Sequence, residues 1–314
     1  MVFIIFAFQH KNMSQHHHTH NHGMPEGKNL FLSVVLNLGI TIAQVIGGIV
    51  SGSMALLSDA LHNFSDVLSL LITFFTFRLA QKKHTEKRTF GYRRGEILAA
   101  FINSVTLLVI ASFLVYEAGY RIFHPQKINA QIVVGLALAS ILINGASVLL
   151  IRRGAQKNIN IRSAYLHLFT DMLTSVAVLV GGLLVHYFAL FWVDGVITLL
   201  IALFLIYSGW KILTESVGII MLFSPEEVNI DALARQIEAI DGIKNLHHLH
   251  LWRLTDNQIH MEAHVDVACD MTVSAFEEKL KAIETIAAEM GIHHVTIQPE
   301  WTRNDDKKLI HDTR

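Results

Sequence analysis

The sequence predicts an α-helical membrane bundle of six transmembrane helices, followed by a small soluble α+β domain. Three observations lead to this fold class. The 314 residues are 52% hydrophobic and 16% charged, whereas soluble domains average about 25% charged residues. The apolar residues gather in six runs, each near the ~20 residues that a helix needs to cross a bilayer. After Phe223 the composition becomes that of a soluble domain, with strand-like alternation between two helical patterns.

The six apolar runs are the predicted membrane spans. They lie at Leu30–Ser51, Met54–Leu79, Ile97–Tyr120, Ala130–Ile151, Ala164–Tyr187 and Leu190–Ile212. The connections after the second and fourth runs are rich in Lys and Arg, whereas those after the first and fifth are short and uncharged. Because basic residues collect on the cytoplasmic side of a membrane, we expect both termini in the cytoplasm.

Two of the runs contain a histidine four residues before an aspartate. His62 precedes Asp66 in the second run, and His167 precedes Asp171 in the fifth. Residues four apart share one face of a helix. The predicted topology runs these spans in opposite directions, so each histidine would lie level with the aspartate of the other span. A charged side chain at the centre of a span costs about 2.5–3.5 kcal/mol and normally marks a transport path or proton relay.

These four side chains predict a tetrahedral site for a divalent metal ion, because zinc accepts His nitrogen and Asp oxygen ligands. In the alternative interpretation, the histidines form hydrogen bonds with a neighbouring helix and the aspartates are neutral. Asp59 lies one turn before His62 on about the same face. We interpret it as a carboxylate behind the ligands or at the entry to the site, rather than as a fifth ligand.

Residues 224–302 are predicted to form a cytoplasmic domain with the element order αββαβ. The expected elements are a helix at Pro225–Ile240, strands at Leu246–Leu254 and Ile259–Val267, a helix at Val273–Met290 and a strand at His294–Gln298. One face of the second strand carries His260, Glu262, His264 and Asp266. This pattern fits either a metal-binding surface or a solvated strand face.

Histidine is unusually frequent, with 19 residues. Five of them lie near the start of the chain, at His16, His17, His18, His20 and His22. We expect residues 1–28 to form a disordered cytoplasmic tail whose composition suits loose metal capture, although a solvated tail without a role in transport fits equally well. We expect a transport domain over residues 29–223 and a second disordered tail over 303–314.

The remaining composition excludes several classes of site. Cys269 is the single cysteine, so an internal disulfide and a zinc site built on paired cysteines are excluded. The formal net charge is −1, which provides no overall basic surface for nucleic acid.

The chain resembles the cation diffusion facilitator family from about Asn29 to Trp301. The resemblance rests on four motifs in the family's order: Gly52-Ser53-Met54-Ala55-Leu56-Leu57-Ser58-Asp59-Ala60-Leu61-His62, Arg88-Thr89-Phe90-Gly91-Tyr92-Arg93-Arg94, the histidine and aspartate of the fifth span, and His247-His248-Leu249-His250-Leu251-Trp252. It implies a ferredoxin-like cytoplasmic domain. It also implies a homodimeric exchanger of a bacterial inner membrane that moves zinc, with cadmium as a second substrate, out of the cytoplasm against protons.

The resemblance also implies roles for particular residues. The transport ligands would be His62, Asp66, His167 and Asp171. A regulatory zinc site in the cytoplasmic domain would use a further set, matched to His247, His264, His293 and Glu300. The neighbouring histidines His248, His250, His260 and His294 are alternatives for that second set.

Two other classes of protein compete with a transporter. A membrane di-iron enzyme would typically carry Glu-x-x-His motifs, and the six spans contain none. A metal sensor with a membrane anchor would leave the predicted buried aspartates Asp66 and Asp171 unexplained. Metal ligands must be deprotonated, so protons and zinc would compete for a His–Asp site, and the sequence favours an exchanger over an enzyme.

Overall fold

The computed structural model describes residues 25–80, 85–155, 159–303 and 305–310. The chain divides into two compact units, one formed by Met1–Lys87 with Ala99–Leu213 and the other by Arg88–Leu98 with Thr214–Arg314. The histidine-rich stretch that contains His16 to His22 lies outside the described residues.

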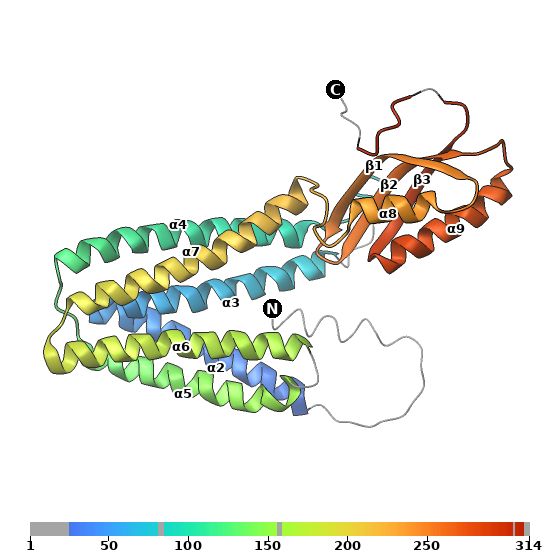
Figure 1. Ribbon diagram of the computed structural model, residues 1–314. Coiled ribbons are helices and arrows are strands. Elements are labelled where there is room, and N and C mark those ends of the chain that lie inside the picture. The colour runs from blue at the N-terminus through green and yellow to red at the C-terminus, as the bar shows by residue number, and fades with distance from the viewer. Residues whose placement is uncertain (1–24, 81–84, 156–158, 304, 311–314) are drawn as a thin grey trace. The chain divides into compact units, whose positions relative to one another are not determined.

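Within the described residues, six long helices correspond to the six predicted spans. They are α2 (Pro25–Ser51), α3 (Met54–Ala80), α4 (Gly95–Phe123), α5 (Ala130–Ala155), α6 (Ile159–Phe188) and α7 (Trp192–Ile220) (Figure 1). Four segments, in α4 to α7, are long and apolar enough to cross a membrane, and α2 contributes a shorter apolar segment at Val35–Ser51. The predicted helical membrane bundle is therefore confirmed.

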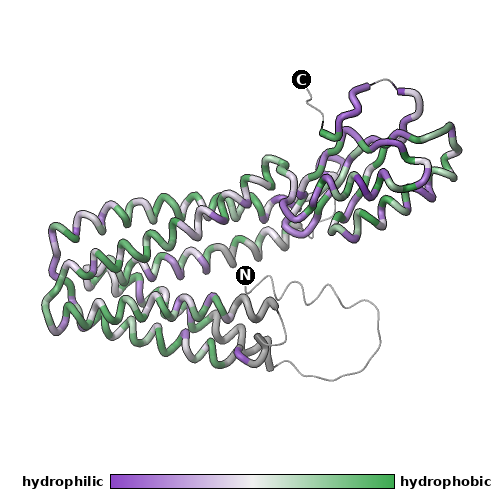
Figure 2. The backbone as a smooth tube through the Cα atoms, viewed as in Figure 1, coloured by the Kyte–Doolittle hydropathy of each residue, from purple (hydrophilic) through white to green (hydrophobic). Residues whose placement is uncertain are grey.

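The outer surface of the bundle is apolar. Large hydrophobic side chains such as Ile49, Phe113 and Tyr207 are exposed, and Figure 2 shows apolar residues along the helices. An exposed apolar surface of this extent is unusual for a soluble protein. It fits a lipid environment, in which helices satisfy their own backbone hydrogen bonds.

The first helix begins earlier than the sequence suggested. It starts at Pro25, so the prediction of disorder over residues 1–28 is wrong for residues 25–28. Proline is favoured at the first helical position because its fixed φ suits the helix and its missing N–H has no partner there in any case.

The second unit contains the predicted αββαβ order. Its elements are α8 (Ile230–Glu238), β1 (Ile243–Thr255), β2 (Gln258–Val267), α9 (Val273–Glu289) and β3 (Ile292–Glu300). The described strands form one sheet in the order β1-β2-β3, with β1 antiparallel and β3 parallel to β2. Helix α8 starts five residues later than Pro225 because the side chain of Asn229 caps it, accepting a hydrogen bond from the Ala232 N–H at 2.9 Å.

One face of the sheet is buried beneath α8 and α9 (Figure 1). In β2, Met261, Ala263 and Val265 are completely buried, as the alternation in the sequence predicted. They pack in a core with Leu233 of α8 and Ile283 of α9. The opposite face of β2 therefore presents His260, Glu262, His264 and Asp266 away from this core.

The stretch after β3 is ordered against the sheet, which corrects the predicted disordered tail for residues 305–310. The carbonyl oxygens of Lys308 and Leu309 accept hydrogen bonds from the N–H groups of His248 and Leu249, at 3.1 and 2.8 Å. The pairing of β1 with β2 shifts register between His247 and His250. Such a bulge leaves backbone donors without ladder partners, and the tail supplies acceptors for them.

Candidate metal centres

The two His–Asp motifs meet between α3 and α6. His62 Nε2 lies 3.6 Å from Asp171 Oδ1, and His167 Nε2 lies 3.3 Å from Asp66 Oδ2. Within each helix, the histidine and aspartate are 3.8 Å apart in α3 and 3.6 Å apart in α6. Each histidine thus faces the aspartate of the other helix as well as its own, and the structure brings all four predicted residues together.

The spacing of these atoms suits ligands around an ion. With zinc–nitrogen and zinc–oxygen bonds of about 2.0–2.2 Å, tetrahedral ligand atoms lie roughly 3.3–3.6 Å apart. The measured separations of 3.3–3.8 Å are longer than an ordinary N–H···O hydrogen bond of about 2.9 Å. Taking one ligand atom from each residue, those of His62, Asp66 and Asp171 lie within 4.8 Å of one another, and His167 Nε2 lies 3.3 Å from Asp66 Oδ2 and 3.6 Å from Asp171 Oδ2.

Several polar atoms of this cluster are buried without hydrogen-bond partners. Asp171 is completely buried and His62 is 8% exposed, whereas the side chains of Asp66 and His167 are each 34% exposed. Among the described residues, both carboxylate oxygens of Asp171, Asp66 Oδ2 and His62 Nδ1 have no hydrogen-bond partner. An unpaired buried polar group costs about 1–3 kcal/mol, and a charged one costs more. A bound cation could take one ligand atom from each of these three residues, whose nearest ligand atoms lie within 4.8 Å of one another.

Asp59 lies behind the ligands in a different environment. Its carboxylate is completely buried and accepts hydrogen bonds from Gln44 Nε2 at 2.7 Å and from the hydroxyls of Thr174 and Ser175 at 2.7 and 3.0 Å. These donors come from α2 and α6, so one α3 carboxylate connects three helices. A carboxylate with three donors has little capacity left to bind an ion directly.

Sequence reasoning missed a further buried carboxylate, Asp194 at the start of α7. It accepts hydrogen bonds from the Ser53 hydroxyl at 2.5 Å and from the N–H groups of Met54 and Ala55 at 3.0 and 3.3 Å. Arg121 Nη1 lies 3.8 Å from it. Asp194 therefore caps the start of α3, the helix that carries His62 and Asp66. The available signal was an acidic residue inside the last apolar run.

Replacing Asp194 with Ala should lower the stability of the bundle by about 3 kcal/mol, because it uncaps α3 and leaves the largely buried Arg121 without this partner. Thermal unfolding in detergent measures the change. Glu117→Ala removes the other carboxylate paired with Arg121, which is more exposed, and should cost less than about 1 kcal/mol. Equal losses in the two variants would contradict the capping role.

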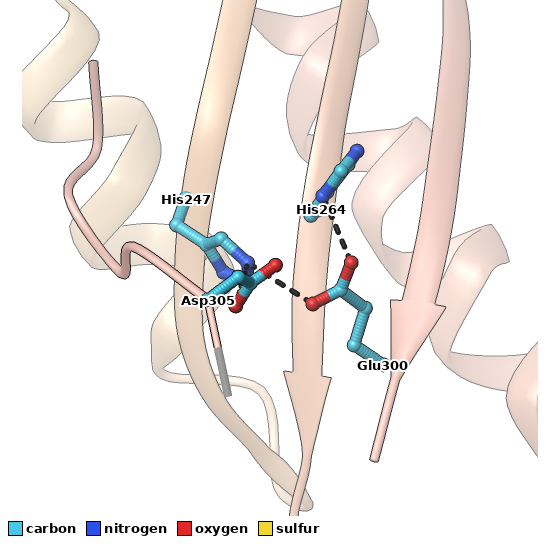
Figure 3. Close-up of side chains that lie close together, drawn as sticks. All are labelled: His247, His264, Glu300 and Asp305. Carbon is cyan, nitrogen blue, oxygen red and sulfur yellow. Dashed lines mark hydrogen bonds and ion pairs between the residues drawn. The ribbon is translucent and has the colours of Figure 1, made fainter. Parts of the chain in front are cut away.

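A second cluster lies at one end of the sheet in the other unit. His247 of β1 is paired across the sheet with His264 of β2, and Glu300 ends β3. Figure 3 shows both histidines converging on Glu300, with Asp305 of the tail beside them. Glu300 lies 3.3 Å from His247 Nε2 and 2.9 Å from His264 Nδ1, and Asp305 lies 3.7 Å from His247 Nε2.

Each of these four residues offers one ligand atom, and the four atoms are close enough to bind a single ion. The four nearest ligand atoms all lie within 4.8 Å of one another. His247 is completely buried, and its Nδ1 has no hydrogen-bond partner among the described residues. Two imidazoles and two carboxylates are the same donor types as in the bundle, and they suit zinc.

The four predicted regulatory residues do not all lie together in the structure. The fold brings His247, His264 and Glu300 together, but His293 lies at the other end of β3, where its Nδ1 is 3.4 Å from the Ile259 N–H. The parallel register explains the separation, because Ile292 pairs with Ile259 and Glu300 with Asp266. The ligand set with His293 is therefore wrong as a single site.

The alternative histidines are also outside the ligand cluster of the sheet. His260 and His294 pair with each other, with ring centroids 4.9 Å apart, and His248 stacks on His264 at 4.6 Å. His250 lies next to His248. Sequence reasoning missed Asp305. This residue follows the last strand, so the alternation of residues in the strands gives no reason to place it beside His247.

Lys307 approaches the same carboxylates. Its ammonium donates hydrogen bonds to Asp266 at 2.8 Å and Glu300 at 3.2 Å, and it lies 2.5 Å from Asp305. Partial burial opposes the charge, but these carboxylates outweigh it and raise the pKa of Lys307 above its usual range. The hydrogen bond from Lys307 lowers the pKa of Asp305 to about 2.

A helical bundle with an apolar surface and a partly buried His–Asp cluster, joined to an αββαβ domain with a second cluster, defines a class of multi-pass membrane proteins that handle metal ions. Family models support this class over most of the chain. Residues 30–221 match the cation efflux transmembrane domain, and residues 225–301 match the cation efflux protein, cytoplasmic domain. The chain belongs to the cation diffusion facilitator family, as the sequence motifs suggested.

Characterised relatives span nearly the whole chain. The cadmium, cobalt and zinc/H(+)-K(+) antiporter of Bacillus subtilis is 36% identical over 93% of this chain and 95% of its own. The metal cation efflux system protein CzcD of Cupriavidus metallidurans is 33% identical over 90% and 89%. The zinc transporter ZitB of Escherichia coli is 31% identical over 91% and 92%. The protein is therefore a metal cation efflux transporter and not an enzyme.

Proposed function

We propose that the protein exports Zn²⁺ from the cytoplasm in exchange for protons, with Cd²⁺ as a second substrate. The observation that carries the proposal is the meeting of His62, Asp66, His167 and Asp171 between α3 and α6, where one ligand atom each from His62, Asp66 and Asp171 lies within 4.8 Å of the others and His167 Nε2 lies 3.3 Å from Asp66 Oδ2. The names of the relatives support it, since they include zinc, cadmium and cobalt as substrates and H⁺ as a counter-ion.

The charge balance of the site explains how zinc can cross the membrane. Two carboxylates and two neutral imidazoles carry two negative charges, so the site is neutral when it holds a divalent cation. The empty site would be a buried dianion, which is costly in a low dielectric. Protons can neutralise it instead, and exchange of protons for zinc avoids a bare charged site at any stage.

Protons compete with zinc because each ligand must be deprotonated to bind metal. Histidine has an ordinary pKa near 6.5 and changes charge in the physiological range. When the site faces outward, arriving protons displace zinc. When it faces inward, the protons leave and zinc binds again. Movement of helices around a central site is the general pattern of such alternating access.

Asp59 acts in this proposal as a positioning residue. Its hydrogen bonds to α2 and α6 hold α3 at the distance that brings the two motifs together. It remains outside the metal-binding set, as the sequence suggested.

We further propose that the protein works as a homodimer with both termini in the cytoplasm and that the cytoplasmic domain binds zinc as a regulator. The uneven distribution of basic residues between connections supports the orientation. The cluster of His247, His264, Glu300 and Asp305 supports the regulatory site. The histidine-rich stretch that contains His16 to His22 would capture zinc loosely and contribute no ligand within the bundle.

Metal uptake into inverted membrane vesicles tests the transport proposal. A panel of Zn²⁺, Cd²⁺, Co²⁺, Ni²⁺ and Mn²⁺ would be offered with an imposed pH gradient, an imposed K⁺ gradient or neither. We expect zinc and cadmium to accumulate, and an acidic vesicle interior to accelerate their uptake. Uptake that follows only the K⁺ gradient, or that ignores both gradients, would contradict proton exchange.

The regulatory site predicts zinc-dependent stabilisation of the cytoplasmic domain, residues 224–314. At zinc concentrations about 100-fold above the Kd, binding should stabilise the native state by about 2.7 kcal/mol. For a domain of this size, the melting temperature should rise by about 10 °C or more. His247→Ala with His264→Ala should abolish the rise, whereas the matched pair His260→Ala with His294→Ala should retain it. A rise that survives the first pair would place the zinc elsewhere.

A further inference from the structure

The stretch after β3 returns to the sheet at the cytoplasmic metal cluster. Its backbone pairs with the bulge of β1 through the carbonyls of Lys308 and Leu309. The side chain of Asn245 donates a further hydrogen bond to the carbonyl of Lys307 at 3.3 Å. These contacts hold the backbone at Lys307 and at the two residues after it, so the Lys307 side chain reaches the cluster from a defined position.

The ammonium of Lys307 occupies the position of a cation among the candidate ligands. It lies 3.2 Å from Glu300 Oε2, 2.5 Å from Asp305 Oδ1 and 3.4 Å from His247 Nε2. Each of these three atoms belongs to a residue of the metal cluster, and Asp266 provides a fourth contact at 2.8 Å. A divalent ion bound to Glu300, Asp305 and His247 would need the same volume.

We propose that Lys307 is a tethered cation that occupies the cytoplasmic metal site in the absence of metal, so that zinc binds only by displacing it. The inference rests on the regulatory site proposed above. An ammonium and a zinc ion cannot share these carboxylates, because they repel each other and compete for the same lone pairs. The lysine thereby raises the zinc concentration at which the site fills.

Displacement of Lys307 would also couple metal binding to the contacts that residues 305–310 make with the sheet. The tail continues to Ile310, which lines a cavity of about 380 Å³ together with Trp252, His250 and Leu222. When zinc displaces Lys307, residues 305–310 retain the backbone bonds to His248 and Leu249, and Asp305 exchanges its ion pair with Lys307 for a bond to the metal.

Zinc titration of the full chain tests this competition. The background variant carries Asp66→Ala and Asp171→Ala, with the five histidines from His16 to His22 replaced by Ser, so that the cytoplasmic cluster is the proposed site that remains. Lys307→Gln should tighten the zinc affinity by about tenfold, which corresponds to the loss of a competing partly exposed ion-pair network. Lys307→Arg retains the positive charge and should leave the affinity near that of the parent.

Lys308→Gln is the matched control, because Lys308 is adjacent in sequence and pairs with Asp306 outside the cluster. It should leave the zinc affinity unchanged. Equal affinities in the parent, Lys307→Gln and Lys308→Gln proteins would overturn the role of Lys307 while leaving the regulatory site intact. If neither the parent nor Lys307→Gln binds zinc, the regulatory site itself is wrong and the inference fails with it. Binding that appears only in Lys307→Gln would support both.

Discussion

Asp66→Ala and Asp171→Ala should each reduce zinc transport by at least about 100-fold while the protein remains folded and inserted in the membrane. The loss of a direct ligand should exceed the 10- to 100-fold effect typical of residues that only orient ligands. Each variant also removes one of the two charges that balance the divalent ion. Zinc flux into vesicles, normalised to the amount of inserted protein, gives the result.

Stability distinguishes this account from a structural role for the aspartates. The carboxylate oxygens of Asp171 have no hydrogen-bond partner among the described residues, so its removal breaks no hydrogen bond. The metal-free Asp171→Ala protein should therefore be about as stable as the parent. Thr170→Ala, at the adjacent position of α6, should retain full transport. A strongly destabilised Asp171→Ala protein, or substantial zinc flux in it, would contradict the assignment.

Replacing His62 or His167 with Asp should shift the metal preference from zinc and cadmium towards manganese. The change replaces an imidazole nitrogen with an oxygen, and all-oxygen sites suit harder ions. We expect the ratio of zinc to manganese uptake to fall by about tenfold or more, which corresponds to about 1.4 kcal/mol of altered preference. Parallel uptake assays with both metals measure the ratio.

His186→Asp provides the control for this substitution. His186 lies near the end of α6, the helix that carries His167. It is exposed and lies outside the cluster. Its replacement makes the same chemical change without altering the ligands, so the metal preference should not move. An unchanged ratio in the His62 and His167 variants would show that selectivity resides outside the four residues.

The transmembrane cluster could be predicted because its signals are local. A histidine and an aspartate four residues apart share a helix face wherever the helix packs, and the bilayer length fixes the helices. The opposite directions of the spans then place His62 opposite Asp171. By contrast, the contact between Asp194 and Ser53 joins residues distant in sequence, and no pattern within either span reveals it.

The cytoplasmic cluster was predicted only in part because it depends on strand register. Alternation in β2 places His264 on the face opposite the core, but it does not set which residue of β3 lies beside it. The parallel pairing puts Glu300 near His264 and moves His293 to the far end. Asp305 and Lys307 follow the last strand, and they reach the cluster because a bulge in β1 leaves donors for the tail backbone.

The central claim is that His62, Asp66, His167 and Asp171 carry zinc in one direction and protons in the other. Purified protein in liposomes, with zinc and pH indicators recorded together, tests it most directly. We predict that zinc movement is accompanied by proton movement in the opposite direction and that Asp171→Asn, which keeps the side-chain shape but not the charge, abolishes both fluxes. Zinc flux without counter-flow of protons in the parent, or zinc flux that persists in Asp171→Asn, would contradict the claim.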